Sequence, residues 1–234
     1  MMYIMRTKNL IKKIIPRAVL KLRSEYLLEK QRNNFRKGCK ELLELVDDLL
    51  RSEGIQYWLT YGTLLGAYRD HDFIAHDYDI DIAIFWTERY KIKDLMLGAG
   101  FKLKHEVHFG DWDDPENIEY RFELNKTFID IDFYKVNGNV ATTCNPAFIP
   151  GTSHEAGVKF LVITEELYNP FEGLSDIDFL GRTYKVPSNT EEFIIANYGK
   201  DFRTPIKNYN YKEHSTNVRE FTLDEKRSYM IVYE

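Results

Sequence analysis

Hydrophobic and polar positions recur with two different periods along the chain, which predicts a mixture of helices and strands. From Ser24 to about Glu53, apolar residues recur every three or four positions, as in a helix that packs one face on a core. Ser24 is the predicted N-cap of this helix and Gly54 its stop. A second helix is predicted from Thr87 to about Ala99, which adjoins Gly98 and Gly100.

Shorter apolar runs between turn residues predict strands. The first is expected over 55–60, followed by a turn and a short helix over 64–68. Further strands are expected over 80–85, 101–109, 118–124 and 128–136. Nearer the C-terminus, the pattern predicts a hairpin over 179–184 and a helix capped by Ser188 or Asn189 that ends at Gly199. The sequence thus predicts an α/β (α+β) fold, a mixed sheet flanked by helices with a C-terminal helical and hairpin extension.

Composition agrees with one enzyme-sized domain. The 234 residues are 44% hydrophobic, enough to bury a sizeable core. Cys39 and Cys144 form neither a disulfide framework nor a pair with metal-ligand spacing. No apolar run approaches the roughly 20 residues that span a bilayer, and the N-terminus lacks the features of a signal peptide. We therefore expect a cytoplasmic protein.

Charge is unevenly distributed. Residues 1–23 contain seven lysines and arginines and no acid, interleaved with apolar residues, whereas the whole chain has a formal net charge of −5. This basic amphipathic segment can lie in the interface of an anionic membrane, or it can be a helix that packs on the body or frays. The acidic remainder, 24–234, is the predicted single catalytic domain, and its charge argues against nucleic-acid binding.

Three aspartates lead into an apolar strand. Asp77, Asp79 and Asp81 occupy alternate positions, so their side chains point to the same side. Neighbours at this spacing lie about 6.6 Å apart along a strand, close enough to hold a divalent cation between them. Without a cation, three adjacent carboxylates repel one another. The pattern therefore predicts a metal site at the end of a buried strand.

A second acidic pair follows in another predicted strand. Asp130 and Asp132 are again two residues apart, so both can face the side of the first cluster. One of them can complete a metal site, and spacing alone does not choose between them. Either can instead accept hydrogen bonds from backbone amides.

Several motifs match a known family. Three segments together resemble the signature of the LicD family: Gly62 to Arg69 (GTLLGAYR), Phe73-Ile74, and His76 to Asp81. This family includes bacterial phosphocholine transferases and fukutin-related sugar phosphotransferases. Ala75-His76 stands where Pro-Trp is common. The resemblance covers roughly residues 35–205 and continues in 129–131, 186–187 and 198–202. It implies a nucleotidyltransferase-like fold and favours Asp130 over Asp132.

Hard oxygen ligands suit Mg²⁺ or Mn²⁺, which can bridge the pyrophosphate of an activated donor. Asp79, Asp81 and Asp130 are the predicted ligands; Asp130 or Asp132 can also accept the proton of the attacking hydroxyl. Asp77 is a supporting acid or an additional ligand. Gly62 and Thr63, at a helix N-terminus, are predicted to bind substrate phosphate. Arg69 can pair with a phosphate of the donor, or it can be an ordinary surface arginine. His76 adjoins Asp77 and can position it.

Three functions are compatible with these residues. The resemblance implies a phosphotransferase that moves a phospho-alcohol, such as phosphocholine, from a CDP-activated donor to a sugar hydroxyl of a cell-surface glycan. If the basic segment binds membrane, the enzyme would act at the inner face of the membrane. A nucleotidylyltransferase that uses a nucleoside triphosphate is the alternative enzyme, and it would release pyrophosphate instead of CMP. A non-catalytic glycan- or partner-binding module is the third hypothesis, which the complete set of carboxylates disfavours.

Overall fold

The computed structural model of the chain describes residues 17–152, 154–206 and 210–234. Its helices are α2 (Arg17–Ser52), α3 (Tyr61–Leu65), α4 (Arg89–Gly98), α5 (Thr190–Tyr198) and α6 (Tyr211–His214), with a π-helical turn over Gly66–Asp70 and a 3₁₀ turn over Trp86–Glu88. Its strands are β1 (Tyr57–Leu59), β2 (Asp79–Phe85), β3 (Lys102–Gly110), β4 (Pro115–Leu124), β5 (Thr127–Asn137), β6 (Val140–Ala147), β7 (Phe160–Pro170), β8 (Leu174–Phe179), β9 (Arg182–Pro187), β10 (Val218–Phe221) and β11 (Ser228–Val232).

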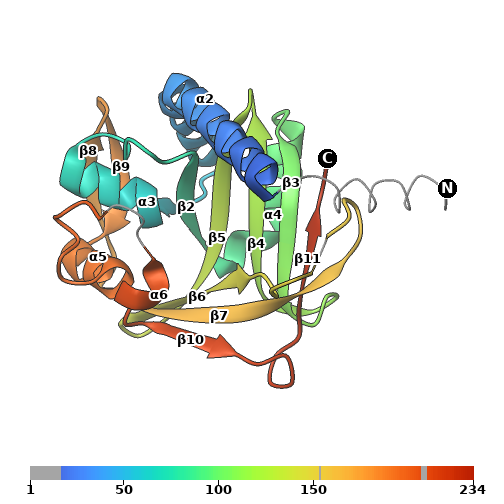
Figure 1. Cartoon of the computed structure of the whole chain (residues 1–234). Coiled ribbons are helices and arrows are strands. Elements are labelled where there is room, and N and C mark those ends of the chain that lie inside the picture. The colour runs from blue at the N-terminus through green and yellow to red at the C-terminus, as the bar shows by residue number, and fades with distance from the viewer. Residues whose placement is uncertain (1–16, 153, 207–209) are drawn as a thin grey trace, which may run out of the picture.

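Six antiparallel strands close into a ring. The pairs β5–β4, β4–β3, β3–β11, β11–β7, β7–β6 and β6–β5 return to their starting strand, which gives a barrel-like sheet (Figure 1). β2 joins the ring by pairing parallel to β5, and β1 pairs antiparallel to β2. Strands β8 and β9 form a separate hairpin. The predicted mixed α+β class is confirmed.

The alternation of β2 and β5 separates the core from the carboxylates. Ile82 and Ile131 are fully buried, as are Leu43 and Val46 of α2, which packs on these two strands (Figure 1). Neighbouring strand residues point to the opposite side, so the helix-covered face is apolar and the aspartates lie on the other face. Burial of α2 therefore fixes the direction in which Asp79 and Asp81 point.

The first helix begins earlier than predicted. α2 already includes Arg17, and Ser24 is an interior residue whose hydroxyl donates to the Lys21 carbonyl over 2.7 Å. Ser24 is therefore not an N-cap, because good helix formers precede it and its side chain bonds within the helix. Residues 1–16 of the basic segment lie outside the described residues, so its contact with membrane stays a prediction. No described helix is long and apolar enough to cross a bilayer.

The C-terminal part contains the predicted hairpin and helix. β8 and β9 form the hairpin, and Asn189 is the N-cap residue of α5, although its side chain accepts the Glu172 amide at 3.2 Å and does not cap the helix. Strands β6, β7, β10 and β11 were not predicted. Their buried positions include polar residues such as Thr143, Thr164 and Ser228, which break the apolar alternation that marks a strand in a sequence.

Candidate active site

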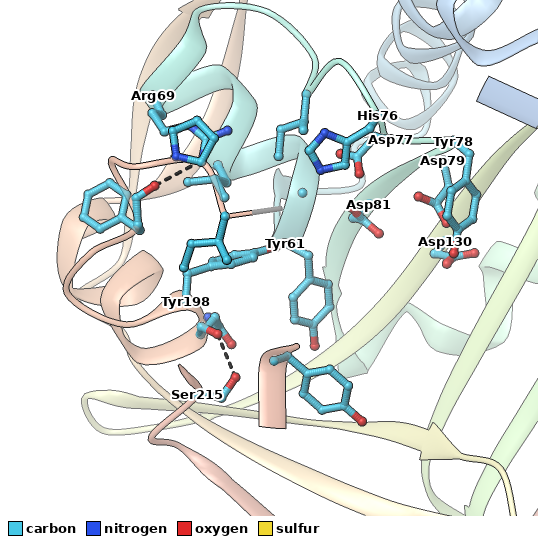
Figure 2. Close-up of a pocket in the computed structure, with 18 of the residues that line it drawn as sticks. Tyr61, Arg69, His76, Asp77, Tyr78, Asp79, Asp81, Asp130, Tyr198 and Ser215 are labelled. Atoms are coloured by element: carbon cyan, nitrogen blue, oxygen red, sulfur yellow. Dashed lines mark hydrogen bonds between the residues drawn. The ribbon is translucent and has the colours of Figure 1, made fainter. Parts of the chain in front are cut away.

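A cavity of about 460 Å³ opens beside the start of β2 (Figure 2). One part of its wall is acidic and comes from β2, β5 and the loop that precedes β2. The other part comes from α3, β6, the end of α5 and the chain around α6, and apart from Arg69 it is aromatic or neutral: Tyr61, Asn145, Tyr198, Phe202 and Tyr211. A cavity with one charged end and one aromatic end can hold a ligand whose charged group is attached to a ring or a polyol.

Strand register brings the predicted carboxylates together. Asp81 on β2 is the partner of Asp130 on β5, and both line the cavity together with Asp77 and Asp79. Asp132 lies on the same face of β5, but it is 3% exposed, is the cross-strand partner of Glu119, and is not among the cavity-lining residues. The cavity thus presents four of the five predicted acids.

Gly62 and Thr63 shape the acidic end. A Cβ atom on Gly62 would lie 2.7 Å from Oδ2 of Asp77 and 3.2 Å from Oδ2 of Asp81, so only glycine leaves room for both carboxylates. The Thr63 hydroxyl accepts the Asp81 amide at 2.9 Å, and the Thr63 amide donates to the Asp81 carboxylate at 3.4 Å. In this structure these two residues position a carboxylate, which is a different role from the predicted binding of phosphate.

Arg121 is a site residue that the sequence analysis did not identify. It lies on β4 opposite Asp130, and its guanidinium donates to both oxygens of Asp130, over 2.6 and 2.5 Å. The same guanidinium donates to Oδ2 of Asp79 over 2.6 Å. One arginine thus joins two of the three predicted metal ligands.

Arg69 and His76, both predicted site residues, also line the cavity. Arg69 donates to both oxygens of Asp70, over 2.8 and 2.7 Å, and to the Phe202 carbonyl over 3.1 Å. Figure 2 shows Arg69 at one end of the site and Asp79 and Asp130 at the other.

The loop that carries Asp77 is tied to α2. Arg32 donates to the His76 carbonyl at 2.9 Å, and Arg36 donates to the Ala75 carbonyl at 2.8 Å. These bonds hold the backbone on the N-terminal side of Asp77, so the long helix positions an acid of the cavity.

Burial and mutual repulsion make the acids reluctant to ionise. Burial raises the pKa of Asp77 to about 6, and burial with the charge of Asp130 raises the pKa of Asp79 to about 8 although Arg121 opposes it. Burial and the neighbouring Asp79 raise the pKa of Asp81 well above its ordinary value. A cation or a proton is therefore needed to compensate this cluster.

The donor set suits a hard cation. The four acidic side chains offer carboxylate oxygens, which Mg²⁺ and Mn²⁺ prefer. Asp77 and Asp81 both approach Gly62, and neither forms an ion pair with a described residue. Across the described part of the chain, no three acidic, histidine or cysteine side chains already converge as a metal cage. Asp79 and Asp130 are instead directed at Arg121.

The raised pKa values predict an unusual dependence of stability on pH. A carboxyl whose folded pKa lies above its ordinary 3.8 stabilises the fold at low pH, and this contribution is lost as pH rises through about 6 for Asp77 and about 8 for Asp79. In EDTA, we expect the free energy of unfolding to fall by up to about 1.4 kcal/mol per pH unit for each group.

Chemical denaturation between pH 4.5 and 9 measures this dependence. Asp77→Asn should make the decline below about pH 6 shallower than in the wild type, because Asp79 still contributes there, and saturating Mn²⁺ should remove most of the rest. Wild-type and variant profiles that run parallel would show that Asp77 does not titrate in this range.

Comparison with known proteins defines the class. Residues 54–189 match the family described as LicD/FKTN/FKRP, nucleotidyltransferase domain. The match covers more than half of the chain, so the protein belongs to this family. The matched residues include β2 and β5, which carry the aspartates, and the turn at Gly62.

Two groups of relatives are similar over most of the chain. The human protein named ribitol-5-phosphate transferase FKTN is 34% identical over 188 residues, which cover 79% of this chain and 37% of FKTN. The human ribitol 5-phosphate transferase FKRP is 27% identical over 169 residues, which cover 70% of this chain and 31% of FKRP. The chain therefore spans about a third of the length of these relatives.

Proposed function

We propose that the chain is a metal-dependent phosphotransferase that moves a phospho-alcohol from a CDP-activated donor to a sugar hydroxyl of a glycan. The observation that carries the proposal is the row of carboxylates along one wall of a cavity whose lining also includes Arg69, Arg121 and several aromatic residues. The names of the relatives favour ribitol 5-phosphate as the transferred group over the phosphocholine suggested by the sequence motif.

Asp79, Asp81 and Asp130 are the residues that would hold Mg²⁺ or Mn²⁺. Bound there, the cation would neutralise charge on the pyrophosphate of the donor. Thr63 fixes Asp81, and Gly62 leaves room for Asp77 beside it. The protein's contribution is the placement of these oxygens before substrate arrives.

The transfer breaks the bond between the pyrophosphate bridging oxygen and the phosphorus of the alcohol phosphate, and CMP leaves. The acceptor hydroxyl oxygen forms the new bond to this phosphorus, and its proton passes to a carboxylate. Asp132 is not on the cavity wall, whereas Asp77 is and has no ion pair among the described residues. We therefore assign proton acceptance to Asp77.

The reaction is tested by product analysis. With Mn²⁺, CDP-ribitol and a glycan acceptor, we expect CMP release in step with acceptor phosphorylation, and EDTA should stop both. CDP-choline and CDP-glycerol in parallel reactions identify the alcohol. Pyrophosphate release from a nucleoside triphosphate would replace the proposal with the nucleotidylyltransferase alternative, and donor binding undiminished by EDTA would remove the role of the metal.

A further inference from the structure

The Arg121 guanidinium holds Asp79 and Asp130 together in the way that a cation would. It makes three charge-assisted hydrogen bonds of 2.5–2.6 Å to these two carboxylates. The side chain of Arg121 is only 23% exposed, that of Asp79 13% and that of Asp130 15%. Two rings flank the guanidinium, with the centroids of Tyr78 and Phe128 at 5.9 and 5.8 Å. Arg121 is thus held in one place by acids and rings.

The position of Arg121 follows from the sheet. Asp81, Asp130 and Arg121 lie at partner positions on three adjacent strands, β2, β5 and β4. Side chains at such positions project from the same face, so the arginine sits at one end of a row of carboxylates. Its backbone is held between β3 and β5 by strand pairing, so rotation of the side chain alone can change its partner.

A cation bound by Asp79 and Asp130 would need the oxygens that Arg121 occupies. Two positive charges cannot share these oxygens at close range without strong repulsion in a partly buried site. A displaced Arg121 would stay at the cavity wall, which it lines, where a donor diphosphate would lie in the proposed reaction. A guanidinium matches phosphate oxygens in geometry and charge.

We propose that Arg121 is a positioning residue that competes with the divalent cation for Asp79 and Asp130, and that cation binding turns its guanidinium toward the donor diphosphate. This proposal rests on the proposed function for the identity of the diphosphate. In the metal-free protein Arg121 keeps the two acids together, and with metal bound it becomes a phosphate contact.

Metal titration tests the competition without any turnover. Arg121→Gln should bind Mn²⁺ about tenfold more tightly than the wild type in calorimetry at constant pH, because a competing cation is removed. Its melting temperature in EDTA should fall, and Mn²⁺ should raise it by more than in the wild type. With Mn²⁺ present, its affinity for CDP should drop by at least about tenfold.

Arg69→Gln is the matched control, because it removes the same charge from the lining of the same cavity, and Arg69 contacts neither Asp79 nor Asp130. Its Mn²⁺ affinity should stay within about twofold of the wild type. Equal Mn²⁺ affinities in the two variants would overturn the competition, and an unchanged CDP affinity in Arg121→Gln would overturn the phosphate contact.

A conservative variant guards against misfolding. If Arg121→Gln does not fold, Arg121→Lys keeps the charge but loses the paired hydrogen bonds, and its Mn²⁺ affinity should still exceed that of the wild type. If the wild type releases no CMP while Arg121→Gln still binds Mn²⁺ more tightly than the wild type, the proposed reaction is overturned and the competition stands.

Discussion

Asp81→Asn should lower the turnover of CDP-ribitol at least about a thousandfold, a loss of about 4 kcal/mol of transition-state stabilisation. The amide keeps the shape of the side chain but loses the charge that would hold the cation. The hydrogen bonds with Thr63 involve the Asp81 backbone amide and Oδ2, so the fold should persist. In EDTA the variant should melt at or above the wild-type temperature, because one of four crowded negative charges is gone.

CMP release with Mn²⁺ and thermal melts in EDTA measure the two parts of this prediction. Asp114→Asn is the control, since it makes the same chemical change at an exposed position in the turn before β4, and it should leave both values unchanged. Activity within tenfold of wild type in Asp81→Asn would contradict the assignment of Asp81 as a ligand.

Gly62→Ala should be nearly as damaging as loss of a carboxylate. The added methyl would meet Oδ2 of Asp77 at 2.7 Å, so the acid or the turn must move. We expect turnover to fall about a hundredfold or more, since small displacements of reacting groups have effects of this size, and the free energy of unfolding to fall by about 1–3 kcal/mol.

Gly98→Ala provides the comparison. Gly98 lies at the end of α4, and a Cβ atom there would meet no heavy atom within 4 Å. It should leave turnover unchanged and stabilise the protein by up to about 1 kcal/mol. If Gly62→Ala kept full turnover while losing stability, the glycine would serve the fold and not the acidic end of the cavity.

The acidic wall was predictable because local rules determine it. Alternation along a strand puts Asp79 and Asp81 on one side, and the family motif adds Asp130. Arg121 could also have been found. The two-residue turn at 125–126 sets the register of β4 and β5, and this register places Arg121 opposite Asp130.

Other features depend on contacts that are distant in the sequence. Arg69 donates hydrogen bonds to Asp70 and to the Phe202 carbonyl, and Arg32 donates to the His76 carbonyl. The bonds to Phe202 and His76 follow from tertiary packing that no local pattern encodes. The closure of the barrel through β6, β7 and β11 was missed because hydrogen-bonded polar residues, such as Thr164 with Ser228, occupy buried strand positions. Periodicity detects apolar faces and does not detect paired polar ones.

The parallel pairing of β2 with β5 also affects how the site is assembled. The two strands are separated in the chain by α4, β3 and β4, so their pairing closes a long loop whose entropy must be offset by contacts formed elsewhere. Asp81 and Asp130 meet only after this intervening part has taken its place. A nascent or partly folded chain therefore has scattered acids with little affinity for divalent ions, and the proposed metal site would form only once folding is complete.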